Sequence, residues 1–173
     1  MKIRVLPYDS SAYIIGLASA LVLSTAYIFE YFANLQPCIL CLYQRLPYAA
    51  AITIMVLAVF LKKHPRLMPF LFGITAILFF ISSGLAVFHV GVEQHFWQGT
   101  SECGNFISAD NVESLRKKLL AQPLIRCDEI AWSLFGLSMA GYNFLISAAL
   151  LLYLIGVLHL QQHQGVRIDD KKQ

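Results

Sequence analysis

The sequence has little charge: 13% of its 173 residues are Asp, Glu, Lys or Arg, whereas 58% are hydrophobic. Because soluble domains carry about 25% charged residues, this shortage excludes an ordinary water-soluble protein. Four long stretches contain no Asp, Glu, Lys or Arg: 10–29, 46–61, 67–88 and 130–166. A helix needs about 20 apolar residues to cross the hydrocarbon core of a bilayer. These stretches therefore predict four transmembrane helices and leave no room for a separate soluble domain.

The predicted fold class is an all-α membrane protein, in which a bundle of four transmembrane helices forms a single domain over residues 1–173. We expect the helices at about 12–31, 40–61, 67–90 and 138–160. The first stretch is longer than the apolar region of a secretory signal and lacks a small-residue cleavage site. We therefore expect it to be retained as a helix.

Two connections, at about 33–39 and 91–136, are expected on the same side of the bilayer, and only the second is long. In the second, Asp110 and Glu113 have the spacing of a capping box. Three apolar residues repeat there at helical spacing: Val112, Leu115 and Leu119. This pattern predicts a short amphipathic helix that lies on the membrane surface.

The basic residues predict the orientation, because cytoplasmic ends carry an excess of Lys and Arg. Eight of them fall at the two termini and in the short second connection: Lys2, Arg4, Lys62, Lys63, Arg66, Arg167, Lys171 and Lys172. We therefore expect both termini in the cytoplasm and the other two connections outside. The net charge of +3 is explained by this topology and indicates no nucleic-acid partner.

Cysteine is also scarce, and all four cysteines fall in the outward connections: Cys38, Cys41, Cys103 and Cys127. Four cysteines on an oxidising face suggest two disulfides, for which three pairings exist. The Cys38-x-x-Cys41 pair precedes a helical stretch, and the amino end of a helix lowers a thiol pKa. Arg45 follows Cys41 by one helical turn.

The cysteine pair has three chemical interpretations: zinc site, structural disulfide or redox pair. Zinc normally requires a second close pair or histidines at ligand spacing, and Cys103 and Cys127 are far apart in sequence. A disulfide across two residues closes a small loop and constrains the unfolded chain little. A relay is favoured, in which the Cys103–Cys127 pair meets a soluble partner and the Cys38–Cys41 pair meets a quinone dissolved in the bilayer.

Specific motifs resemble a known family. They are Pro37-Cys38-x-Leu40-Cys41-x-x-Gln44-Arg45, Cys127-x-x-x-x-Trp132-Ser133-x-Phe135-Gly136-Leu137-Ser138 and His89-x-Gly91-Val92-Glu93. The chain resembles the bacterial disulfide bond formation protein DsbB family over essentially its whole length. The resemblance implies an enzyme of the bacterial inner membrane. This enzyme would reoxidise a periplasmic thioredoxin-fold oxidase of the DsbA kind and pass two electrons to ubiquinone or menaquinone.

The resemblance also implies residue roles. Cys103 would form the mixed disulfide with the partner, and Cys127 would then pair with Cys38. Cys41 would remain as a thiolate facing the quinone ring, with Arg45 beside the ring and His89 assisting. The helix N–H groups and the arginine would favour that thiolate.

Simpler alternatives accompany these roles. Arg45 could only fix topology, and His89 could only bond a carbonyl or headgroup at the interface. Glu30, within one turn of the outer end of the first helix, is expected to reach water. At the level of the whole protein, the alternatives are a vitamin-K-epoxide-reductase-like quinone enzyme and a non-enzymatic scaffold held by two disulfides. A transmembrane reductant importer is excluded, because it needs cysteines within or across the membrane.

Overall fold

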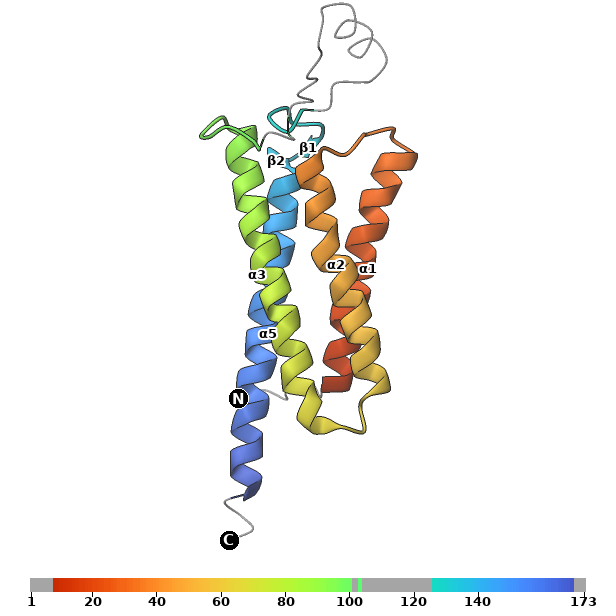
Figure 1. Ribbon diagram of the computed structural model, residues 1–173, viewed down its shortest axis with the longest axis vertical. Coiled ribbons are helices and arrows are strands. Elements are labelled where there is room, and N and C mark those ends of the chain that lie inside the picture. Colours follow the sequence, from red (N-terminus) through yellow and green to blue (C-terminus); the bar gives the residue numbers. More distant parts are fainter. Residues whose placement is uncertain (1–7, 101–102, 104–125, 170–173) are drawn as a thin grey trace, which may run out of the picture.

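The computed structural model describes residues 8–100, 103 and 126–169, with side chains up to Gln161 in the last helix. Its long elements are four helices (Figure 1): α1 (Tyr8–Tyr31), α2 (Ile39–Phe60), α3 (Met68–Glu93) and α5 (Met139–Asp169). A short 3-10 helix, η1 (Pro65–Leu67), precedes α3. Each of the four helices is long and apolar enough to cross a membrane, which confirms the predicted transmembrane bundle.

The helix ends differ from the predicted ones by a few residues, and by more in α5. This helix continues to Asp169, beyond the expected end near 160, because the polar residues after Leu160 do not stop it. Helix α1 begins at Tyr8 rather than near 12, so its first turn carries Asp9, and an acidic residue is favourable at that end. The surface helix predicted from 110 onward lies outside the described residues.

A small hairpin before α5 is the element that the sequence did not predict. Strand β1 (Ser133–Leu134) pairs with β2 (Leu137–Ser138) in antiparallel register. The turn between them places Phe135 at φ 52° and Gly136 at φ 79°. Two positive φ values in a two-residue loop match the turn that follows the natural twist of a hairpin. Ser138, at the expected start of the last helix, closes the hairpin, and α5 begins at the next residue.

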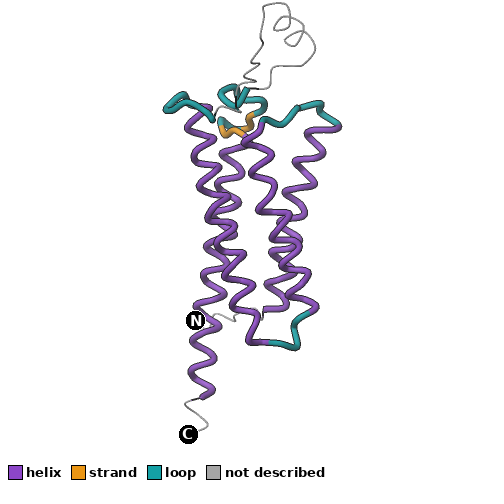
Figure 2. The backbone as a smooth tube through the Cα atoms, viewed as in Figure 1, coloured by secondary structure: helices purple, strands orange, loops and turns teal. Residues whose placement is uncertain are grey.

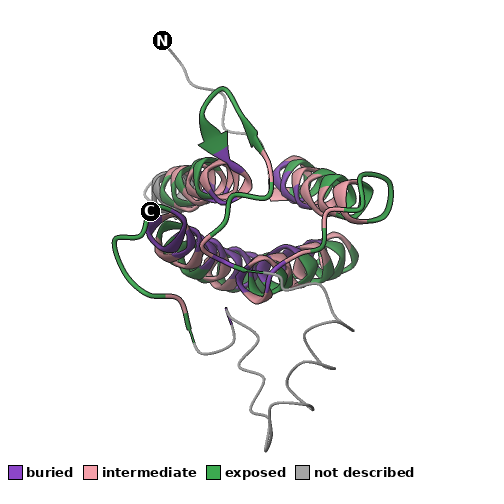
Figure 3. Ribbon diagram, turned by 90° about the horizontal axis from the view of Figure 1, so that it is seen from above, coloured by how far each residue is buried: buried purple, intermediate pink, exposed green. Residues whose placement is uncertain are grey.

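The helices pack in sequence order around the bundle, with α1 on α2, α2 on α3 and α3 on α5, whereas α1 and α5 make little contact. Figure 3 shows the four helices from above. The largest fully buried side chains include Tyr48, Phe72 and Phe79. Many outward apolar side chains are exposed, among them Phe60 (78%) and Phe80 (68%), as expected of a surface that faces lipid.

The cysteines share one end of the bundle. The connection from α1 to α2, the start of the connection after α3 and the hairpin lie together at that end (Figure 2). The described beginning of α1 and the end of α5 lie at the opposite end (Figure 1). This arrangement brings the connections that carry Cys38, Cys103 and Cys127 to a common face.

Candidate active site

The amino end of α2 shapes the first cysteine pair. Cys38 is the N-cap residue, with an extended backbone (φ −71°, ψ 169°), and follows Pro37, which disfavours helix in the residue before it. The backbone N–H of Cys41 donates to the sulfur of Cys38 over 3.4 Å. The sulfur thus satisfies a helix N–H that would otherwise have no partner within the helix.

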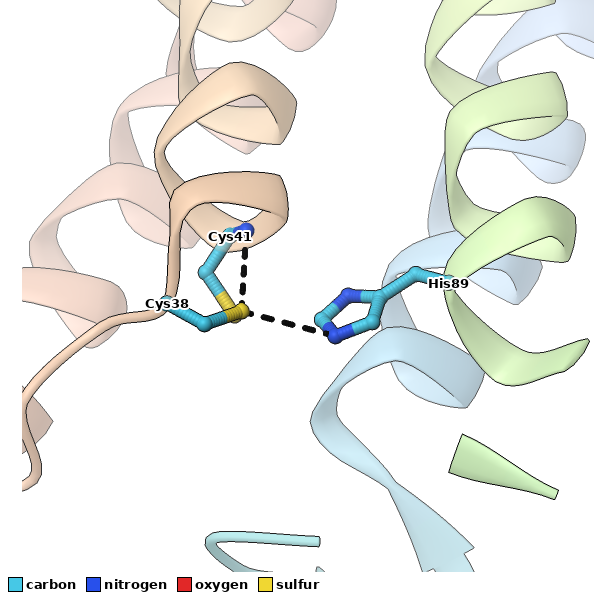
Figure 4. A group of neighbouring side chains, drawn as sticks. All are labelled: Cys38, Cys41 and His89. Carbon is cyan, nitrogen blue, oxygen red and sulfur yellow. Dashed lines mark hydrogen bonds between the residues drawn. The ribbon is translucent and has the colours of Figure 1, made fainter. Parts of the chain in front are cut away.

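The two sulfur atoms are close but not bonded to each other. Their separation is 3.2 Å, and both cysteines are free thiols. His89 approaches from α3, with Nε2 3.5 Å from the Cys38 sulfur (Figure 4). The hydrogen bond from the Cys41 thiol, followed in size by the contact with His89, lowers the pKa of Cys38 to about 4. In the reduced pair, the negative charge therefore resides on Cys38.

This negative charge on Cys38 belongs to the reduced pair, whereas the thiolate expected on Cys41 belongs to another state of the protein. The resemblance predicts a Cys41 thiolate when Cys38 is engaged in a disulfide with Cys127. In the structure Cys38 is a free thiol, so its sulfur competes with that of Cys41 for hydrogen-bond donors. The role of Cys41 stays a prediction.

The second pair forms a disulfide between Cys103 and Cys127, with a Cα–Cα distance of 5.1 Å. Both residues are buried, and they pack with Cys38, Leu40 and Val92 in one cluster. Three cysteines are therefore buried in a single packed group, and the partly buried Cys41 packs against it. This cluster joins the loop disulfide to the amino end of α2.

Tryptophan packing fixes the start of the loop that leads to Cys103. Trp97 donates from its indole N–H to the carbonyl of Phe88 over 2.9 Å and stacks on the Phe88 ring. The indole lies directly over Gly91, where an added Cβ would come within 1.9 Å of Trp97 Cζ2. Only glycine leaves this space free, which explains Gly91 in the His-x-Gly-Val-Glu motif.

Arg45 forms an ion pair that the sequence analysis missed. Its Nη1 contacts Oε2 of Glu30 on α1, and the two side chains are 15% and 19% exposed. The guanidinium also lies over the ring of Tyr27, 5.0 Å from its centroid. The expectation that Glu30 reaches water was therefore wrong, because the carboxylate instead offsets the charge of a partly buried arginine. Opposite charges at facing ends of two helices joined by a short connection were the available signal.

A cavity of about 620 Å³ adjoins the first cysteine pair. Its walls come mainly from α1, α2, α5 and the segment before the hairpin, with His89 and Glu93 from α3. Most of its lining is apolar, with Leu21, Phe29 and Ile146 among the contributors. Its polar lining residues include Cys41, Gln44, Arg45, His89 and Asn143. Apolar walls with a few convergent polar groups are typical of cofactor and small-molecule sites.

Two further polar side chains make contacts that the sequence analysis did not predict. Glu93 accepts a hydrogen bond from Ser138 Oγ, and this contact ties the end of α3 to the hairpin. Asn143 on α5 donates to Gln44 Oε1 over 2.7 Å. Gln44 belongs to the motif that carries the resemblance, but its partner lies 99 residues away in the chain and has no local signal.

The group formed by Cys38, Cys41 and His89 also has the chemical character of a metal site, since its three ligand atoms lie within 4.8 Å of one another. Zinc bound by two thiolates at about 2.3 Å in a tetrahedral site would hold the sulfurs roughly 3.8 Å apart. The observed 3.2 Å is shorter and suits two thiols that share a proton. We therefore interpret the group as a redox pair with a histidine neighbour.

The chain is similar to a protein family and to one curated protein. The family model described as "Disulfide bond formation protein DsbB" matches residues 9–157. An uncharacterized protein of Rickettsia prowazekii (strain Madrid E), RP370, is 32% identical over 139 residues, which cover 79% of each chain. No solved structure matches the chain.

Proposed function

Since the chain belongs to the disulfide bond formation protein DsbB family, and is thus a membrane oxidoreductase of disulfide formation, we propose a specific reaction for it. It reoxidises a thioredoxin-fold thiol oxidase of the DsbA kind in the periplasm. It then passes the two electrons to ubiquinone, or to menaquinone where that is the available quinone. The alternative of a vitamin-K-epoxide-reductase-like enzyme has no support from the family match.

The observation that carries this proposal is the packed cluster of Cys38, Cys103 and Cys127. In the proposed reaction a soluble dithiol partner approaches the loop disulfide from the aqueous side, and this disulfide packs in one cluster with Cys38, the N-cap residue of α2. Thiol–disulfide exchange requires an attacking thiolate to meet a disulfide sulfur directly. The shared cluster supports a direct exchange between the two pairs, because they already pack together.

The exchange proceeds in two balanced steps. A thiolate of the partner attacks the Cys103–Cys127 disulfide at Cys103 and forms a mixed disulfide, while Cys127 leaves as a thiolate. The second thiol of the partner resolves the mixed disulfide, so the partner leaves oxidised and the loop pair holds two electrons. Cys127 then attacks Cys38 in the oxidised Cys38–Cys41 pair, so a Cys127–Cys38 disulfide forms and Cys41 leaves as a thiolate. Cys103 next attacks Cys127, which re-forms the loop disulfide and releases Cys38, and both electrons then lie on the first pair.

The cavity beside Cys41 fits a quinone by its chemistry. A quinone ring has flat apolar faces and two carbonyl oxygens, and the cavity offers apolar walls with the guanidinium of Arg45 as a donor. A bound quinone would accept two electrons and two protons and would leave as the quinol. Arg45 would hold positive charge beside the oxygen that gains electron density, and Glu30 and Tyr27 would hold the guanidinium in place.

The proposed setting is the bacterial inner membrane, with both termini in the cytoplasm and all four cysteines on the periplasmic side. The excess of basic residues at the termini and in the short connection before α3 supports this orientation. The common face of the cysteine-bearing connections is consistent with it. An oxidising compartment on that side also suits the loop disulfide.

Thiol trapping in membranes tests the proposal. Membranes with and without quinone are treated with a reduced thioredoxin-fold partner, quenched with acid and alkylated, and the state of each cysteine is read by mass spectrometry. We expect Cys38 and Cys41 to be oxidised with quinone and to accumulate as alkylated thiols without it. A matched sample of the Cys41→Ser variant should lose the quinone dependence. Cysteine states that are the same with and without quinone would indicate a disulfide-held scaffold instead.

A further inference from the structure

A chain of buried polar side chains leads from the middle of the bundle to the Cys38 sulfur. His89 is 3% exposed, Gln44 is 7% exposed and Tyr48 is 1% exposed. Gln44 and Tyr48 lie on α2, His89 lies on α3, and Asn143 on α5 joins the two residues of α2. Such groups are costly to bury unless each one finds a hydrogen-bond partner, and here each has one on the next member of the chain.

The carbonyl of Leu85 determines which group donates and which accepts in these hydrogen bonds. A carbonyl oxygen only accepts hydrogen bonds, so the Gln44 atom 3.5 Å from it is the amide nitrogen Nε2. The same nitrogen lies 3.1 Å from His89 Nδ1. Because Nε2 of Gln44 is a donor, Nδ1 of His89 accepts. The proton of the neutral imidazole is therefore on Nε2, which faces the Cys38 sulfur at 3.5 Å.

The hydrogen bonds from Tyr48 through Asn143 to Gln44 have the same direction from donor to acceptor. With its nitrogen directed to His89, Gln44 presents Oε1 to Asn143, whose Nδ2 donates over 2.7 Å. Asn143 then presents Oδ1 to Tyr48, whose hydroxyl donates over 2.5 Å. Ser147 lies 2.7 Å from this hydroxyl and 2.9 Å from Ser82. Every donor from Tyr48 onward is thus aimed toward the cysteine pair.

We propose that Gln44 and Asn143 are positioning residues, which hold His89 as the Nε2–H tautomer and direct this N–H to the sulfur of Cys38. A carboxylate also lies near the Nε2–H group of His89. Glu93 Oε1 lies 3.9 Å from His89 Nε2, farther than the sulfur, and Glu93 is held by Ser138. The Cys38 sulfur, at 3.5 Å, is therefore the nearer acceptor for the Nε2–H group of His89.

The consequence concerns the strength of the Cys38–Cys41 disulfide as an oxidant. A donor that stabilises a thiolate stabilises the reduced pair, and a more stable reduced form makes the disulfide more oxidising. A strongly oxidising pair is what electron uptake from a strongly oxidising partner requires. The inference rests on the proposed function only where it explains why a strongly oxidising pair is needed. The His89 tautomer and the reduction potential are properties of this protein alone.

Nitrogen NMR of the reduced full-length protein, labelled with ¹⁵N-histidine in detergent micelles and free of quinone and partner, tests the tautomer directly. His89→Ala identifies the signals. We expect His89 in the wild-type protein to carry its proton on Nε2 and to have an unprotonated Nδ1. Gln44→Leu should remove this preference. A proton on Nδ1 of His89 in the wild-type protein would overturn the proposal without reference to any variant.

The reduction potential of the Cys38–Cys41 pair, measured against a dithiol buffer without quinone, is the second readout. We expect Gln44→Leu to make the pair less oxidising by about tenfold in the equilibrium constant, or about 30 mV for two electrons. His89→Ala should have a similar effect, and the double variant should have no larger one, because Gln44 acts through His89. Gln94→Leu, at an exposed position after α3, is the matched control and should leave the potential unchanged.

Two results would contradict the proposed action of Gln44 through His89. Additive effects of Gln44→Leu and His89→Ala would mean that Gln44 supports the fold rather than the histidine. An unchanged potential in Gln44→Leu would mean that the tautomer has no effect on the pair. An intact Cys103–Cys127 disulfide in each variant shows that the variant has folded. A wild-type potential in Gln44→Leu would leave the proposed quinone reaction unaffected, so the two ideas fail separately.

Discussion

Removing the charge of Arg45 should destabilise the protein and impair its reaction for two separable reasons. In Arg45→Met, Glu30 remains partly buried without its cation. Breaking a fully buried ion pair from one side costs about 3–5 kcal/mol, and an exposed pair is worth less than about 1 kcal/mol. With side chains 15% and 19% exposed, we expect a loss of about 2 kcal/mol. This loss corresponds to a lower Tm by about 4–8 °C in a chain of this size.

A second substitution separates the two effects. Glu30→Gln removes the unpaired carboxylate, so the Arg45→Met/Glu30→Gln protein should recover most of the lost stability. Quinone reduction should not recover with it, because the positive charge beside the ring is still missing. Arg45→Lys, which keeps the charge but not the planar fork, should restore part of the activity.

The assay combines thermal unfolding in nanodiscs with steady-state reduction of a ubiquinone analogue. A double variant as unstable as Arg45→Met would refute the ion-pair argument. Wild-type quinone kinetics in Arg45→Met would leave the arginine with a topological role only.

Further predictions address the loop and the first cysteine. Cys103→Ser should abolish oxidation of the thiol partner but leave the pair at Cys38 able to react with quinone, as partner turnover and quinone-driven thiol loss will show. Gly91→Ala should displace the Trp97 ring, which lies within 1.9 Å of the new Cβ, and so change the tryptophan fluorescence and slow partner turnover, whereas Gly84→Ala, with no atom within 4 Å, should not. Alkylation of Cys38 in the reduced protein should keep its rate as the pH falls from 9 and should halve near pH 4, the value to which its pKa is lowered. Because this pKa lies below the ordinary 9.0, the reduced protein should lose stability as the pH falls from 9 toward 4, which urea unfolding can measure.

Local sequence signals predicted much of this molecule. Stretches without charge identified four helices, because the bilayer demands a run of apolar residues. The hairpin before α5 escaped prediction. Its turn places Phe135 at φ 52°, a backbone conformation uncommon for a residue other than glycine. The surface helix predicted around Leu115 lies outside the described residues and stays a prediction.

The site was only partly predictable, because several of its contacts join distant segments. Cys38, Cys41 and Arg45 stand in a compact motif and could be singled out from their spacing. Glu30 was not assigned to Arg45, since opposite charges at the facing ends of α1 and α2 do not by themselves fix how the two helices pack. Asn143 meets Gln44 across 99 positions of sequence, and a lone polar residue in an apolar helix does not name its partner.

Simultaneous measurement of thiols and quinone tests the central claim most directly. The protein is reconstituted in lipid vesicles with ubiquinone, a reduced thioredoxin-fold partner of the DsbA kind is added, and the loss of partner thiols and of quinone absorbance is followed together. We predict that one quinone is reduced for every two partner thiols lost and that both losses stop when quinone is omitted. Partner thiols that persist, or that disappear equally fast without quinone, would contradict the account.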